Sequence, residues 1–139
     1  MNLPETKKEM KIGELATRSG LSVDTIRFYE KQGLLPSPRR SASNYRLYSS
    51  DAPRRLVFIR KARDLGFTLQ EIGQLLRLSE DRHAGAADVK DRAMAKLDDL
   101  DRRIAEMKAM RESLQRLVGA CSGLGDTDHC PILAALAED

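Results

Sequence analysis

The sequence predicts a mainly α-helical protein, in which a small head of short helices and one β-hairpin precedes a single long helix. Apolar residues recur at helical spacing in residues 12–33 and again in 52–78. Prolines and an asparagine turn interrupt this pattern at residues 34–50, and strict 4-3 apolar spacing runs through 88–119. A chain of 139 residues has room for one such head with an appendage.

The first two helices form a candidate helix-turn-helix. Residues 12–18, "IGELATR", carry one apolar face, and Gly20 supplies a turn. Ser22 is the expected N-cap of the second helix, and Gly33 is its expected end. Two short helices joined by a glycine-bearing turn are typical of this motif, although many such hairpins bind no nucleic acid. The second helix carries side chains suited to base-edge and phosphate contacts: Asp24, Thr25, Arg27, Tyr29 and Lys31.

The next segment, residues 34–50, is predicted to form a β-hairpin. Pro36 and Pro38 exclude a helix, and "YRLY" alternates as a short strand does. A plain connecting loop is the alternative. The density of arginine and tyrosine favours a wing that grips phosphates, formed by Arg39, Arg40, Tyr45 and Arg46.

Two further helices complete the expected head. One is capped by Ser50 or Asp51 and ends at Gly66. The segment "TLQE", residues 68–71, is a capping box that opens another amphipathic helix. The first of these two helices is expected to bury Leu56, Ile59 and Leu65.

The long helix, residues 88–119, carries a narrow apolar stripe that predicts a coiled-coil seam. A stripe with charges on the other faces needs a partner helix, most simply its own copy in a symmetric dimer. Packing onto the head of the same chain is the weaker alternative, because a helix of about 45 Å outreaches so small a head. Arg111 interrupts a seam otherwise formed by Ala93, Leu97, Leu100, Ile104, Met107, Leu114 and Val118.

The charge distribution suggests a polyanion partner for the front of the chain. Residues 1–67 hold 14 Lys and Arg against 7 Asp and Glu, a balance of +7, whereas residues 68–139 hold 10 against 14, a balance of −4. The only histidines are His83 and His129, and there is no glycine loop that would cradle a phosphate. We therefore expect no enzyme activity.

The same chain is expected to be cytoplasmic. It has no apolar run of about 18–20 residues that would span a membrane, and its first residues lack the apolar core of a secretory signal. Thiols are normally reduced in the cytoplasm. Cys121 and Cys130 therefore suggest metal or redox chemistry more than a structural disulfide.

The segments "IGELATRSGLSVDTIRFYEKQGLL" and "NYRLY", with the long helix that ends in a cysteine loop, resemble the MerR family of bacterial transcription regulators. The resemblance implies a winged helix-turn-helix head in residues 11–80, a dimerisation helix in 88–119, and a metal-binding loop with a C-terminal cap in 120–139. Residues 1–10 would be an N-terminal extension. It also implies that the DNA contacts come from Arg18, Thr25, Arg27, Tyr29, Arg39, Arg40, Tyr45 and Arg46.

The resemblance further implies an antiparallel coiled-coil homodimer that binds double-stranded promoter DNA together with RNA polymerase. In this family the effector shifts the two heads, so that the DNA bends and untwists and transcription is activated. The tail "ACSGLGDTDHCPIL" is most similar to the copper-efflux branch.

The cysteine loop limits the choice of ion by its chemistry. Two thiolates suit a linear site for Cu(I), Ag(I) or Au(I), whereas Zn²⁺ usually takes four ligands. His129 would be an extra donor in a divalent site, and a thiol–disulfide switch is a further alternative. In the family's antiparallel arrangement Ala86 would face the partner's Cys121. Divalent-sensing branches carry a cysteine there, and monovalent sensors usually carry a serine.

Overall fold

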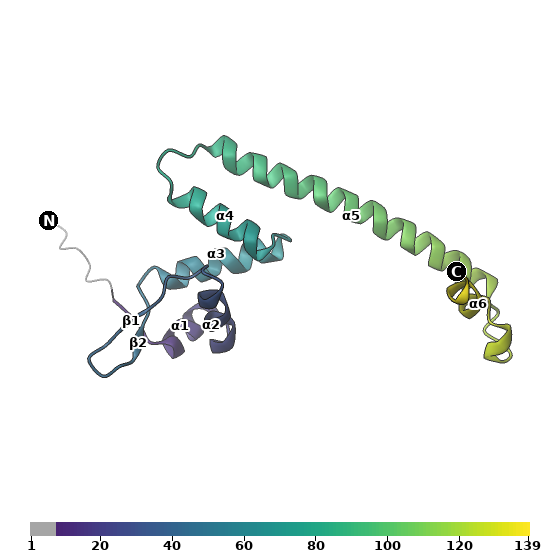
Figure 1. Cartoon of the computed structure of the whole chain (residues 1–139), viewed down its shortest axis with the longest axis horizontal. Coiled ribbons are helices and arrows are strands. Elements are labelled where there is room, and N and C mark those ends of the chain that lie inside the picture. Colours follow the sequence, from purple (N-terminus) through teal and green to yellow (C-terminus); the bar gives the residue numbers. More distant parts are fainter. Residues whose placement is uncertain (1–7) are drawn as a thin grey trace. The chain divides into compact units, whose positions relative to one another are not determined.

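The computed structural model describes residues 8–139, and the chain divides into a head that ends at Ala93 and a second unit, Met94–Asp139 (Figure 1). Residues 1–7 of the expected N-terminal extension lie outside the described residues. Most of the described chain is helical, as predicted. None of the helices in residues 8–139 is long and apolar enough to cross a membrane.

The helix-turn-helix forms as predicted, from α1 (Ile12–Ser19) and α2 (Val23–Lys31). Gly20 ends α1 with a φ of +73°, a left-handed conformation that glycine adopts without strain. The Ser22 hydroxyl accepts a hydrogen bond of 3.1 Å from the Thr25 amide, which confirms the expected N-cap. The helix α2 ends at Lys31, two residues before Gly33, and so close to its predicted end.

The predicted β-hairpin is also present, as β1 (Arg39–Arg40) and β2 (Arg46–Leu47). The two strands are antiparallel, with Arg40 across from Arg46. Asn44 turns the chain with a φ of +66°, a conformation that asparagine tolerates better than most residues. This hairpin is the wing of the head.

Two helices follow the wing, α3 (Ala52–Asp64) and α4 (Leu69–Glu80). The capping box at the start of α4 is complete: the Thr68 hydroxyl accepts from the Glu71 amide at 3.2 Å, and the Glu71 carboxylate accepts from the Thr68 amide at 2.8 Å. The prediction that Leu65 is buried is wrong, because its side chain is 65% exposed. Leu65 lies just past the end of α3, where the chain no longer follows the buried helical face.

The hydrophobic core joins these elements, with α1 packed against both α2 and α3, and α3 packed against α4 (Figure 1). Burial of each large apolar side chain contributes roughly 1.5–3 kcal/mol. Met10, at the end of the expected extension, belongs to this core and pairs with Tyr48 through backbone hydrogen bonds of 2.9 and 2.7 Å. The fully buried side chains include Leu15, Ile26, Leu56, Ile59 and Ile72.

The rest of the chain is α5 (Ala86–Ala120), the short 3₁₀ helix η1 (Thr127–His129) and α6 (Pro131–Ala137). The long helix therefore forms with nearly the predicted bounds. Its apolar stripe is largely uncovered in the single chain, where Met107 is 67% exposed. Other seam residues that are at least half exposed are Leu97, Ile104, Leu114 and Val118.

Candidate DNA-binding surface and cysteine loop

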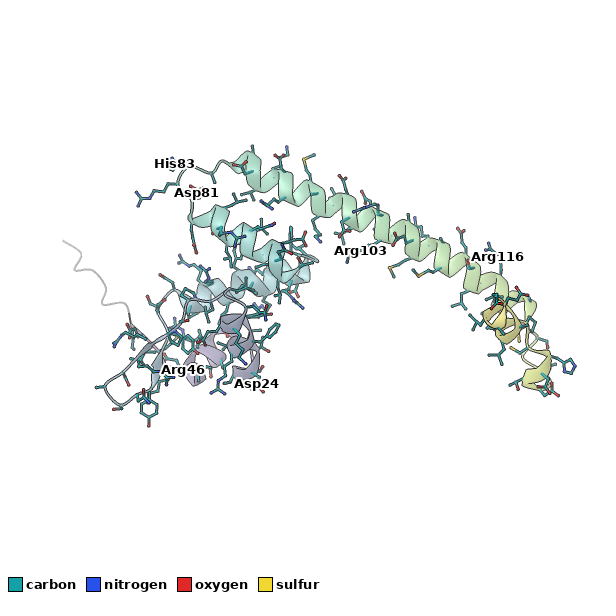
Figure 2. All side chains as sticks on the ribbon, viewed as in Figure 1. Asp24, Arg46, Asp81, His83, Arg103 and Arg116 are labelled. Carbon is teal, nitrogen blue, oxygen red and sulfur yellow. The ribbon has the colours of Figure 1, made fainter. Side chains whose placement is uncertain are left out.

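A groove of about 1380 Å³ lies between the two helices of the helix-turn-helix and the wing. Figure 2 labels Asp24 and Arg46, which come from the two sides of this groove. Its walls carry cationic and acidic side chains: Lys11, Arg27, Lys31, Arg40 and Arg46 beside Glu9, Glu14, Asp24 and Glu30. Four of the eight residues predicted to contact DNA line it: Arg27, Arg40, Tyr45 and Arg46.

The other four predicted residues lie elsewhere in the head. Arg18 is exposed in the last turn of α1. The Thr25 hydroxyl lies 2.8 Å from the Ser22 hydroxyl and so takes part in the N-cap of α2. Arg39 is 63% exposed but pairs with Glu9, whose hydrogen bond and charge raise the pKa of the guanidinium. Tyr29 is only 7% exposed, because it belongs to the apolar face of α2 and packs in the core.

Two arginines of the wing have partners that leave their guanidinium groups partly free. Arg40 donates to the Asn44 carbonyl at 3.2 Å, within the hairpin itself. Arg46 lies 3.9 Å from the Glu30 carboxylate, and its side chain is 41% exposed. Both side chains therefore keep donors directed to the groove or to solvent, because a guanidinium has five N–H donors.

Two residues that tie the wing to the helices were not predicted as site residues. Lys11, before α1, places its ammonium 4.0 Å from the centre of the Tyr45 ring, a cation–π contact. The Glu30 carboxylate accepts a hydrogen bond of 2.9 Å from the Tyr48 hydroxyl. Neither pair has a signal in the sequence, because each joins residues at least 18 positions apart.

The two cysteines lie close together in the loop that follows α5. They are separated by eight residues of sequence, are not joined by a disulfide, and are each partly exposed. Cys130 occupies the N-cap position of α6. The nearby backbone amides of Leu133 and Ile132 and the Cys121 thiol hold the pKa of Cys130 below its ordinary value, although burial acts in the opposite direction.

No third donor completes this pair in the described chain. Within residues 8–139, no group of three or more His, Cys, Asp or Glu side chains lies close enough together to hold a metal ion. His129 is 87% exposed, and its ring nitrogen instead lies 2.8 Å from the Asp126 carboxylate. His83 lies in the exposed turn between α4 and α5, far along the chain from the cysteines. The loop thus offers one pair of soft thiol ligands.

Two family models match most of the chain. Residues 10–79 match the MerR helix-turn-helix family of regulatory proteins, and residues 54–117 match the family's DNA-binding region. The regulator HmrR of Rhizobium leguminosarum is 44% identical over 93% of this chain and 98% of its own length. The regulator CueR of Salmonella typhimurium is 39% identical over 92% of both chains.

A solved structure shares the fold. The transcription regulator PbrR691 of Ralstonia metallidurans CH34, in complex with lead(II), is 38% identical and superposes with a TM-score of 0.83 over 92% of this chain and 99% of its own. The winged head and the long helix described above are therefore those of a known class of regulator, whose members are DNA-binding proteins and not enzymes. This chain belongs to the MerR family of transcription regulators.

Proposed function

We propose that this protein is a metal-responsive transcription activator that senses a soft monovalent ion, Cu(I), Ag(I) or Au(I), through Cys121 and Cys130. The observation that carries the proposal is the pairing of two thiols, with no third ligand beside them in the described chain, in a protein of a DNA-binding regulator family. Promoter DNA is bound by the heads, and the ion is bound in the loop.

The groove beside α2 supports the DNA-binding half of this proposal. Arg27 lies on the recognition helix, and Arg40 and Arg46 lie on the wing that faces it. Cationic side chains on both sides of a groove are suited to hold the phosphates that flank a major groove, while the recognition helix meets the base edges. Tyr29 would then hold α2 in place through its packing in the core and would not be a main DNA contact.

The uncovered apolar stripe of α5 supports a homodimer. Side chains such as Met107 and Leu114 are more than half exposed in one chain, and a second copy of the same stripe would remove them from water. An antiparallel pair places two heads on one duplex and allows an ion in the loop to alter the angle between them. Activation then follows from DNA bending and untwisting that presents the promoter to RNA polymerase.

The chemistry of the cysteine loop supports a monovalent ion. A linear site needs two thiolates, and one monovalent cation between them leaves a single net negative charge. The amides of Leu133 and Ile132 would stabilise that charge, because they already lower the pKa of Cys130 and so favour its thiolate. Zn²⁺ usually takes four ligands, whereas the loop offers two thiols and the ring nitrogen of His129 contacts the Asp126 carboxylate.

A divalent sensor is the second candidate, and the lead(II) complex of PbrR691 favours it. This chain carries alanine at position 86, so it lacks the thiolate that divalent-sensing branches add from the partner. A disulfide switch between Cys121 and Cys130 is a third candidate, favoured by the contact between the two sulfurs.

Equilibrium competition separates these candidates. Reduced protein is titrated against a Cu(I) chelator and against a zinc chelator, with Cys121→Ser, Cys130→Ser and His129→Ala measured in parallel. We expect tight Cu(I) binding that both cysteine variants lose and His129→Ala retains. Tight zinc or lead binding that falls in His129→Ala would reverse the order of the first two candidates. A Cys121–Cys130 bridge that forms on mild oxidation and alone activates transcription would favour the third.

A further inference from the structure

We propose that Glu30 is a positioning residue: its carboxylate couples the wing to the recognition helix and orients Arg46 toward the DNA backbone. This inference rests on the proposed function, because it concerns how the head binds promoter DNA. Glu30 is one of four acidic residues that line the groove beside its cationic side chains. A carboxylate beside a phosphate contact is unfavourable unless it has another task.

The contacts of Glu30 join two elements of the head. Its Oε2 atom accepts a hydrogen bond of 2.9 Å from the Tyr48 hydroxyl and lies 3.9 Å from Nη1 of Arg46. The Glu30 side chain is only 16% exposed, so this oxygen meets both wing side chains where water is scarce. One carboxylate oxygen of α2 thereby contacts two side chains at the second strand of the wing and just after it.

The Tyr48 side chain is a firm anchor for this arrangement. It is 1% exposed, and its backbone is paired with Met10 on the other side. Burial and the Glu30 hydrogen bond raise the pKa of the phenol, while Arg46 acts in the opposite direction. A shift of the wing relative to α2 would therefore break the Tyr48–Glu30 bond inside the protein.

The geometry leaves Arg46 ready for a phosphate. Its Nη1 atom lies 3.9 Å from Glu30, its guanidinium also interacts with the Tyr48 hydroxyl, and 41% of the side chain is exposed. The remaining N–H donors can meet a phosphate in the fork geometry that arginine prefers. A side chain that Glu30 holds in place would lose less rotamer freedom when the phosphate binds.

A double-mutant cycle tests this coupling. The probe is the duplex that the wild-type protein selects from a pool of random sequences, beside a scrambled duplex of equal composition. Arg46→Ala is expected to weaken binding of the selected duplex roughly tenfold, the loss of one charge-assisted hydrogen bond. In a Glu30→Ala background the same change is expected to alter affinity less than about twofold. Equal effects in both backgrounds would overturn the inference.

Two matched variants separate positioning from charge. Glu14→Ala removes another carboxylate from the same groove. If Arg46→Ala also loses its effect on DNA affinity in this background, only net charge matters. Glu30→Gln keeps an acceptor for Tyr48 and Arg46. In this background we expect Arg46→Ala to weaken DNA binding as much as it does in the wild-type protein. Tyr48→Phe removes the hydroxyl that donates to Glu30. In this background we expect Arg46→Ala to weaken DNA binding less than it does in the wild-type protein.

The test also holds if Glu30→Ala does not fold. Thermal unfolding of each variant is measured first. If Glu30→Ala does not fold, Tyr48→Phe replaces it in the cycle, and Glu30→Gln serves as the control in which Arg46→Ala keeps its full effect. The inference would be contradicted if Arg46→Ala kept its full effect on affinity in the Tyr48→Phe background but lost it in the Glu30→Gln background. If the wild-type protein selects no duplex, the proposed function fails; if it selects one and the cycle is additive, only the role of Glu30 fails.

Discussion

Arg40 lies directly across the wing hairpin from Arg46. Like charges at opposed positions of an antiparallel pair destabilise it, by roughly 0.2–1 kcal/mol. The hairpin has only two paired residues in each strand, and each of these two arginines has one partner, the Asn44 carbonyl for Arg40 and Glu30 for Arg46. A bound DNA phosphate would relieve this repulsion, which fits the DNA contacts proposed for the wing.

Arg40→Ala should separate stability from binding. Removing one of two opposed charges is expected to leave the free energy of unfolding unchanged or to raise it by up to about 1 kcal/mol. The same change should weaken DNA binding and lower the slope of log affinity against log salt concentration by about one. Thermal unfolding and binding across a salt series measure the two effects. An unaltered salt slope would remove Arg40 from the DNA contacts.

The lowered pKa of Cys130 predicts its reactivity. In Cys121→Ser, where Cys130 is the sole thiol, the amides of Leu133 and Ile132 still favour the thiolate. Alkylation near neutral pH should thus be faster in the folded protein than in urea, where the pKa returns to its ordinary value. Because the folded pKa is the lower one, this thiol stabilises the loop fully above the unfolded pKa and ceases to do so as the pH falls through the folded pKa. Equal rates in the folded and unfolded chains would contradict this assignment.

Leu114→Asp should disrupt the dimer. The leucine is 57% exposed in one chain and lies on the stripe proposed to meet the partner helix. Two copies of the variant would bury two unpaired carboxylates, at a cost of the order of several kcal/mol each. Sedimentation equilibrium measures the association, and Ser113→Asp places the same charge beside the stripe as a control. A variant that dimerises as tightly as wild type would show that the stripe is not the interface.

Cys121→Ser should abolish the response to metal but preserve DNA affinity. A hydroxyl is a poor ligand for a soft ion, and even altering groups that only support a ligand costs about 10–100-fold in metal affinity. We therefore expect more than about a hundredfold loss of Cu(I) affinity. Binding of the selected duplex by the metal-free protein should change little. Loss of DNA binding in this variant would indicate a structural cysteine.

Much of the fold follows from local sequence signals. Ser22 and the Thr68–Glu71 box fixed two helix starts, because capping depends on residues within one turn. The wing was predictable from proline and alternating residues, and the long helix from its regular apolar spacing. Leu65 was misplaced because a pattern of apolar residues does not show where the last helical turn ends.

The groove was only partly predictable, because it is built from distant residues. Arg27 and Arg46 were found by their charge and position, but Glu30 and Lys11 gain their roles from partners across the fold. Tyr29 fell on the predicted binding helix, yet one face of that helix must pack in the core. The closeness of Cys121 and Cys130 depends on the loop and on the start of α6, which only three-dimensional structure reveals.

Transcription in vitro is the most direct test of the link between the cysteine pair and gene control. Purified polymerase, the protein and its own promoter are combined under reducing conditions, with Cu(I), Ag(I), Zn²⁺ or Pb²⁺ added in turn. We predict that Cu(I) and Ag(I) raise transcript levels with wild-type protein but not with Cys121→Ser or Cys130→Ser. Transcription that is unaltered by every ion, or that rises equally in the cysteine variants, would contradict the account.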